Sequence, residues 1–197
     1  MLLVLADVLA PEVVARLRAC LDQGQAADGS LVTEALLAHP LFLLGVEPRR
    51  LGAPCFSRYE QGMASHAEVA EAMPDGRGGI RADAGVTMFL NDRAEYDGGE
   101  LVVDTGWGEE KLKEKAGACV VFPASARRGV AEVTRGVRWT AECWVQSLVA
   151  DSSQREILYD IACSASLLDL LFGPGRRSEV DALQTCHRNL LRLWARP

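Results

Sequence analysis

Histidine is scarce in this 197-residue chain, which limits the metal chemistry that the protein can perform. The histidines are His39, His66 and His187. His66 is followed two residues later by Glu68, and a spacing of two places both side chains on one face of a β-strand. An imidazole and a carboxylate on one face can bind a divalent transition metal. The other two histidines lie in segments with helical patterning, so we expect neither to join this pair.

A second group of chemically active side chains lies near residue 140. Alternation along a strand from Arg138 places Thr140, Glu142 and Trp144 on the same face. If Arg138 points into a barrel, Glu142 does so too, and a carboxylate there is costly unless a cation pairs with it. The guanidinium fork suits a bidentate carboxylate ligand. An inward arginine of this kind can also simply pair with an acid of the protein.

Composition and charge exclude several classes of protein. The 21 Lys and Arg residues against 27 Asp and Glu give a net charge of −6, which argues against a general nucleic-acid binder. The six cysteines include no CxxC pair. The N-terminal segment lacks the basic start of a signal peptide, and no apolar run reaches the roughly 18 residues of a membrane helix. We therefore expect a cytoplasmic protein with reduced cysteines that contacts neither nucleic acid nor membrane.

Turn signals divide the chain into three parts of one domain over residues 1–197. Residues 1–40 predict an N-terminal strand followed by helices. Residues 41–148 contain short apolar runs between Gly, Pro and Asp turns, a spacing typical of an antiparallel sandwich or barrel. Residues 149–197 return to helical periodicity.

The expected helices carry start signals. Pro11 suits the first turn of a helix, and Thr33 is a good N-cap for a second one. The segment Ser153-Gln-Arg-Glu156 fits a capping box, and Ser178 opens a last helix. The apolar stripes of these C-terminal helices predict either core packing or a face for oligomerisation.

The β region contains, in order, several motifs that together resemble one family: Phe56-Ser-Arg-Tyr59, His66-Ala-Glu68, Tyr96-Asp-Gly-Gly99, Phe122-Pro-Ala-Ser125, Val133-Thr-Arg-Gly-Val-Arg138 and Trp144-Val-Gln-Ser147. The chain resembles the PKHD-type hydroxylases, which are iron(II)- and 2-oxoglutarate-dependent dioxygenases related to the prolyl 4-hydroxylases. The resemblance covers nearly the whole chain. It implies a mostly β fold with flanking helices, in which a double-stranded β-helix (a jelly roll, cupin-like) forms the core between N- and C-terminal helices.

The resemblance implies an iron(II) site made of two histidines and one carboxylate. The first two ligands fall on His66 and Glu68, where the family carries aspartate at the second position. The second histidine of the family falls on Arg128, whose guanidinium has no lone pair to give a metal. Glu142 is a substitute donor for that position.

The resemblance also implies a 2-oxoglutarate site. Arg138 matches the family arginine that binds the distal carboxylate of 2-oxoglutarate, and Tyr59 matches a tyrosine that contacts this cosubstrate. The changes at the metal positions lead to the hypothesis that Arg128, Glu68 and Glu142 form an ion-pair cluster where iron would otherwise lie.

Three functions follow as hypotheses. The first is a dioxygenase-family protein with a degraded iron site. It would be non-catalytic or weakly active and would act as a partner or regulatory subunit beside an intact paralogue, as a homo- or hetero-oligomer, or as a binder of 2-oxoglutarate or another small carboxylate. The second is an active oxygenase that hydroxylates a C–H bond with iron on His66, Glu68 and Glu142. The third is a cupin-like module that binds a small ligand without oxygen chemistry.

Overall fold

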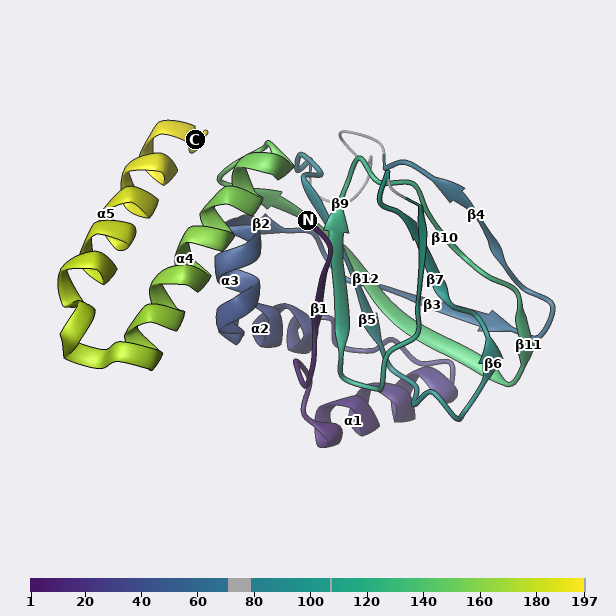
Figure 1. The fold of residues 1–197 in the computed structure, drawn as a ribbon. Helices are drawn as coiled ribbons and strands as arrows, with labels where there is room; N and C mark the ends of the chain where they lie inside the picture. The colour runs from purple at the N-terminus through teal and green to yellow at the C-terminus, as the bar shows by residue number, and fades with distance from the viewer. Residues whose placement is uncertain (71–78, 107, 197) are drawn as a thin grey trace.

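The computed structural model describes residues 1–70, 79–106 and 108–196, and its centre is a barrel of two facing sheets (Figure 1). The larger sheet contains β1 (Leu3–Leu5), β2 (Pro48–Leu51), β3 (Cys55–Glu60), β5 (Ala84–Phe89), β9 (Cys119–Pro123) and β12 (Val137–Ser147). The smaller sheet contains β4 (Ser65–Glu68), β7 (Leu101–Asp104), β8 (Glu109–Leu112) and β10 (Arg128–Val130). A separate short pair consists of β6 (Asp97–Gly98) and β11 (Val133–Arg135).

The order of the strands brings segments that are distant in sequence side by side. The larger sheet runs β1-β9-β5-β12-β2, with β3 also paired to β12, and the smaller runs β4-β10-β7-β8. All the described ladders are antiparallel. Strand β12 is the longest, with 11 residues, and pairs with β2, β3 and β5. It therefore connects most of the larger sheet, which separates an apolar core under the helices from a second one inside the barrel.

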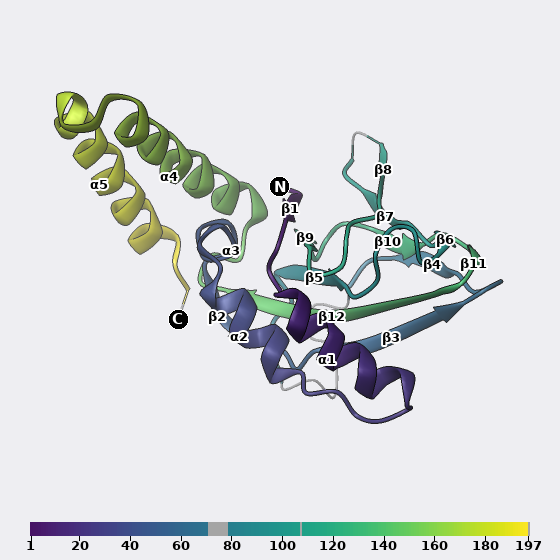
Figure 2. The same cartoon turned by 90° about the horizontal axis from the view of Figure 1, so that it is seen from below.

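The outer face of the larger sheet is covered by helices (Figure 2). Helix α1 (Pro11–Asp22) and helix α2 (Ser30–Ala38) bury their apolar stripes in this core. Trp139 of β12 points to this side, and its ring nitrogen donates to a carboxylate oxygen of Asp22 at 3.0 Å. The side chains of β12 that alternate with Trp139 therefore point the other way, into the barrel.

The space between the two sheets is the inner core. Its buried apolar residues are Phe89, Leu101, Val103, Val120 and Phe122. Trp144 of β12 packs against this cluster from the end nearer the C-terminus of the strand. Aromatic and branched side chains thus fill the middle of the barrel, and polar groups are confined to specific positions on its wall.

Two helix starts differ from those expected from the sequence. Helix α2 begins at Ser30 rather than after Thr33, and the Thr33 hydroxyl donates back to the carbonyl of Gly29. The apolar run expected to open the β region instead forms α3 (Pro40–Val46). Proline at its first position favours helix, and Glu47 ends it in a left-handed conformation with φ of 47°. The strands within residues 41–148 therefore begin with β2, after this helix.

The C-terminal segment forms a helical hairpin that projects from the barrel (Figure 1). It consists of α4 (Ser152–Phe172), the short 3₁₀ segment η1 (Gly173–Arg176) and α5 (Arg177–Trp194). Asp151 caps α4 by accepting from the backbone of Ser153 and Gln154, so the expected capping box is replaced by a single cap one residue before the helix.

The hairpin is apolar and largely exposed. The helical stretch Ser152–Trp194 contains an 18-residue window with a mean hydropathy of 1.4, of which 11% is buried. By length and composition alone, this stretch is long and apolar enough to cross a membrane, which is weak evidence for a membrane helix. The absence of membrane contact accordingly stays a prediction.

Candidate functional site

Four side chains of β12 line the inside of the barrel, as alternation predicted: Arg138, Thr140, Glu142 and Trp144. The strand register adds inward neighbours from both sides. Arg138 lies opposite Tyr59 of β3, and Glu142 lies opposite Thr87 of β5. Because directly opposed residues of an antiparallel pair share a face, all of these side chains face the same interior.

Arg138 is fully buried and lacks a counter-ion among the described residues. Its Nη1 donates to the hydroxyl of Thr140 at 3.5 Å, but its Nε and Nη2 have no hydrogen-bond partner. The guanidinium carbon lies 5.4 Å from the ring centre of Tyr59 and 5.5 Å from that of Phe89. Burial lowers the pKa of Arg138, and this effect is opposed by nearby polar groups. Two donors of a buried cation are thus left for an anion.

Two further hydroxyl groups of the barrel, one near Arg138 and one opposite Glu142, are also buried without a partner. Tyr96 and Thr87 are both fully buried, and neither hydroxyl has a hydrogen-bond partner within the described residues. Burial raises the pKa of Tyr96, whereas the charge of Arg138 and the approach of its guanidinium to the hydroxyl lower it. Buried polar groups are normally satisfied, so the unpartnered nitrogens of the Arg138 guanidinium indicate a site for a small polar ligand. In the sequence, Tyr96 stands out only as part of the Tyr96-Asp-Gly-Gly99 motif, and nothing distinguishes Thr87 from other strand threonines.

Arg128 extends from β10 toward Glu142 of β12. Its Nη1 lies 3.4 Å from Oε2 of Glu142, while Oε1 of that carboxylate is buried without a partner. The guanidinium carbon lies 5.5 Å from the ring centre of Phe122 and 5.1 Å from that of Trp144. We call this set of four residues the Arg128 clamp. A Cβ at Gly85 would collide with both rings, so the glycine allows them to approach each other.

His66 and Glu68 lie on β4 at the edge of the smaller sheet, and both are exposed. Glu68 is the strand partner of Arg128, although within the described residues it forms no ion pair with it. Of the expected ion-pair cluster of Arg128, Glu68 and Glu142, the described residues form only the Arg128–Glu142 pair, and Glu68 lies opposite Arg128 in the strand register without pairing with it.

The donors that the structure provides do not match the iron centre that the resemblance implies. Within residues 1–70, 79–106 and 108–196, no group of three or more His, Cys, Asp or Glu side chains is placed to hold a metal ion. The position expected for the second histidine carries the protonated guanidinium of Arg128, which repels a dication. His39 caps α3 by accepting from the backbone of Phe42, and His187 lies 3.6 Å from Glu47, so neither supplies the missing donor. The 2-oxoglutarate position, by contrast, fits the unpartnered donors around Arg138.

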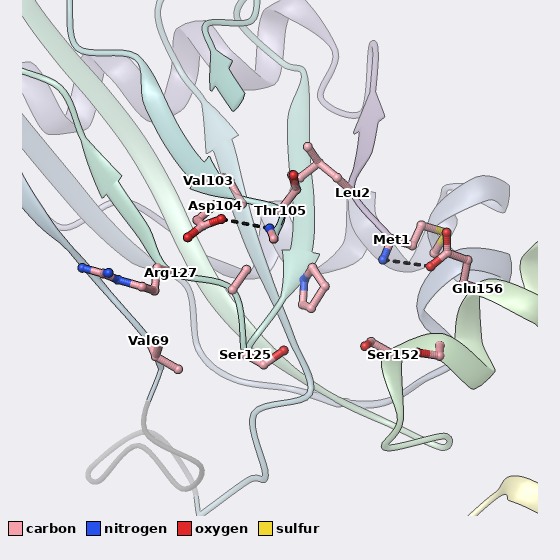
Figure 3. Close-up of a pocket in the computed structure, with 14 residues that line it drawn as sticks. Met1, Leu2, Val69, Val103, Asp104, Thr105, Ser125, Arg127, Ser152 and Glu156 are labelled. Atoms are coloured by element: carbon pink, nitrogen blue, oxygen red, sulfur yellow. Dashed lines mark hydrogen bonds and ion pairs between the residues drawn. The ribbon is translucent and has the colours of Figure 1, made fainter. Parts of the chain in front are cut away.

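A cavity beside the barrel contains none of the predicted site residues (Figure 3). Its volume is about 590 Å³, and it is lined by the N-terminus, the ends of β7 and β9 and the start of α4. Its charged groups have partners: the N-terminal amine of Met1 pairs with Glu156 at 3.3 Å, and Asp104 accepts from the backbone of Gly106. The unpartnered buried atoms therefore locate the candidate site inside the barrel.

Comparison with known proteins identifies the family of this chain. Residues 54–146 match the model of the 2OG-Fe(II) oxygenase superfamily, whose description names the two cofactors expected from the sequence, 2-oxoglutarate and iron(II). A PKHD-type hydroxylase of Acaryochloris marina is 41% identical over 164 residues, which cover 83% of this chain and 73% of the relative. A PKHD-type hydroxylase of a Caulobacter species is 39% identical over 170 residues, covering 85% and 74%.

Solved structures confirm the predicted fold. A prolyl-4-hydroxylase of Pseudomonas putida superposes with a TM-score of 0.55 at 20% identity, covering 74% of this chain and 92% of that one. A viral collagen prolyl hydroxylase from Paramecium Bursaria Chlorella virus-1, in complex with 2-oxoglutarate, gives 0.57 at 14% identity, covering 74% and 95%. The barrel is thus the double-stranded β-helix expected from the sequence. The chain belongs to the 2OG-Fe(II) oxygenase superfamily and, within it, to the PKHD-type hydroxylases.

Proposed function

We propose that this chain binds 2-oxoglutarate or a related small dicarboxylate inside the barrel, on Arg138, and does not hold catalytic iron. It is then a non-catalytic or weakly active family member that acts as a carboxylate binder or as a partner subunit of an intact paralogue. The observation that carries the proposal is the fully buried guanidinium of Arg138, with two unpartnered nitrogens.

The electrostatics of Arg138 favour an anionic ligand. An unpaired charge removed from water is costly, and the cost falls when a carboxylate accepts from the same guanidinium. Among the described residues, the guanidinium contacts the Thr140 hydroxyl and two aromatic faces and forms no ion pair, although the charge of Glu142 acts on it from a distance. The hydroxyl of Tyr96, which lies nearby, is a further donor for the same carboxylate.

The Arg128 clamp supports the absence of iron. A metal ion here would need Glu142 as a ligand, but one oxygen of that carboxylate is already paired with Arg128. The guanidinium is also held between Phe122 and Trp144. Iron would have to break this ion pair and would remain close to a permanent positive charge.

Calorimetric titration of the full chain with 2-oxoglutarate, in buffer containing a chelator, tests the anion site. We expect saturable binding that Arg138→Gln abolishes. Arg50→Gln, which removes an exposed guanidinium from β2, is the matched control and should bind as the wild type does. Equal binding by wild type and Arg138→Gln would show that the carboxylate lies elsewhere.

Anaerobic reconstitution with iron(II), followed by metal analysis and measurement of succinate formed from 2-oxoglutarate, tests the metal site. We expect less than stoichiometric iron and no succinate above a protein-free control. Stoichiometric iron together with succinate formation would overturn the proposal and favour an active oxygenase with iron on His66, Glu68 and Glu142.

The proposed role as a partner subunit is supported by the exposed tip of the C-terminal hairpin. Its large apolar side chains there are Leu167, Leu170, Leu171 and Phe172. Leu170 is 82% exposed, which is unusual for a leucine beside other apolar side chains. Light scattering on the chain alone and mixed with an intact PKHD-type paralogue, repeated for Leu170→Glu, tests this role. A chain that stays monomeric under both conditions would contradict it.

A further inference from the structure

Helix α5 presents one side to α4 and the other to solvent. Figure 1 shows α5 at the outer edge of the molecule, with α4 between it and the barrel. Val180, a buried residue, lies on the side that packs on α4. The opposite side carries a shallow groove, which is lined by Ser178, Asp181, Ala182, Thr185, Cys186, Asn189 and Leu190. We call these residues, together with Arg192 and Leu193 on the next turn, the α5 outer face.

The α5 outer face has a groove at one end and a projecting leucine at the other. The groove is shallow because its floor consists of small side chains, such as Ala182 and Ser178. Leu193 is 74% exposed and lies 11 residues after Ala182, which is about three helical turns along the same side. Helices pack by inserting large side chains of one into spaces between side chains of the other. The face thus carries both halves of such a contact, too far apart to meet within one chain.

The charges at the two ends of the face are opposite in sign. Asp181 lies toward the N-terminal end and Arg192 toward the C-terminal end, and both are exposed. Arg177 lies 3.9 Å from Asp181, at the outer limit of an ion pair, and Arg192 has no ion-pair partner among the described residues. A second α5 laid antiparallel on the first brings opposite charges together, whereas a parallel one brings like charges together. The charge pattern therefore complements an antiparallel copy of itself.

One register satisfies both the shape and the charge. If two antiparallel helices cross at a point midway between Thr185 and Asn189, Leu193 of each copy falls level with Asp181 of the other and enters the groove beside Ala182. Arg192 lies one residue away and reaches the same aspartate. The same contacts are made twice, once on each side of the crossing point, as a twofold axis requires.

We infer that two copies of this chain associate through the α5 outer face as an antiparallel, twofold pair of helices. Helix α5 has 18 residues and is about 27 Å long, so the contact is at the small end of specific interfaces. We expect a dissociation constant of about 10 μM. Because the contact lies outside the barrel, this inference does not depend on the proposed carboxylate site.

Sedimentation equilibrium on the full chain and its variants tests the interface. We expect Leu193→Ala to weaken the dimer by at least about tenfold, because a twofold contact registers each change twice. Leu170→Glu, which alters an exposed leucine at the hairpin tip, is the matched control and should leave the dissociation constant unchanged. Loss of the dimer in Leu170→Glu but not in Leu193→Ala would place the interface at the tip and overturn the inference.

Exchange of the two charges tests the antiparallel orientation. Asp181→Arg and Arg192→Asp should each weaken the dimer by about tenfold, because each places like charges opposite one another. The double variant should restore wild-type affinity, since the pair is then only reversed. In a parallel arrangement the double variant would still oppose like charges, so failure of this rescue would refute the antiparallel register.

Cysteine crosslinking provides a readout that does not depend on affinity alone. The two copies of Cys186 lie near the crossing point, offset by about 3 Å along the axis, and this cysteine is exposed. A short bis-maleimide should crosslink the wild type into a dimer, as it should Cys55→Ser, which removes an exposed cysteine of β3, but not Cys186→Ser. A wild type that stays monomeric at about 100 μM and gives no crosslinked dimer would refute the interface.

Discussion

Replacing Arg128 by methionine should destabilise the protein by an amount that follows from the contacts of the guanidinium. Two unit charges at the observed separation of 3.4 Å attract by about 1 kcal/mol in bulk water and by about 5 kcal/mol at an effective dielectric constant of about 20. The Arg128 and Glu142 side chains are 23% and 16% exposed, which places the pair between these limits. We therefore expect Arg128→Met to lower the free energy of unfolding by about 2–3 kcal/mol.

Methionine is chosen because it isolates the charge. Its unbranched stem fills the space between Phe122 and Trp144, and its sulfur packs well against aromatic rings. The loss then reports mainly the carboxylate of Glu142 left without a cation. For a chain of this length, the expected decrease in Tm is about 5–10 °C. Circular dichroism during heating and urea titration measures both quantities.

A double-mutant cycle separates the pair from its surroundings. Glu142→Gln alone should cost about 1–2 kcal/mol, because Arg128 keeps its stacking and some contact with water. The double variant should lose about 2 kcal/mol less than the sum of the two single losses. Arg127→Met, which removes the exposed neighbouring guanidinium, is the control and should change the free energy by less than about 0.5 kcal/mol. The reasoning is refuted if Arg128→Met stays within that same margin of the wild type.

Three further predictions concern other parts of the fold. Burial raises the pKa of Glu47 above its ordinary 4.5, so the protein loses stability as the pH rises through the pKa of Glu47 in the folded state. Glu47→Gln should therefore stabilise the protein by about 1 kcal/mol near pH 8 and give no gain below pH 4.5, as measured by urea titration. Gly85→Ala should cost about 1–3 kcal/mol in the same assay, because its methyl group collides with the two rings of the clamp, and an unchanged stability would contradict this packing. Burial raises the pKa of Cys119 and Cys143 to about 12, so iodoacetamide at pH 8 should label exposed Cys55 and spare these two, as mass spectrometry of the folded protein would reveal.

The inner wall of the barrel could be predicted because it depends on one strand. A period of two is a property of the extended backbone, so Arg138 and Glu142 had to share a face once the segment was identified as β. The proximity of Arg128 to Glu142 has a different origin. It depends on β10 pairing with β7 and β4, contacts between segments far apart in the chain that no local pattern encodes.

The helix boundaries and the unpartnered hydroxyls were harder to predict, because they too depend on contacts that local sequence patterns do not encode. The run from Leu41 to Val46 is apolar throughout, so its periodicity does not separate a buried strand from a helix. Thr87 looks like an ordinary strand threonine, and only its register opposite Glu142 places its hydroxyl on the inner wall of the barrel. Tyr96 precedes the Asp-Gly-Gly turn, and this neighbourhood is the one sequence signal that could have singled it out.

The clamp explains how such a barrel can remain folded without a metal ion. A carboxylate on the inner wall, as at Glu142, is destabilising unless a cation neutralises it. A metal ion can supply that charge only when it is bound, whereas Arg128 supplies it permanently from the neighbouring sheet. The two aromatic rings hold the guanidinium, so the pair does not depend on solvent for its geometry. The ion pair thereby makes the stability of this wall independent of metal binding.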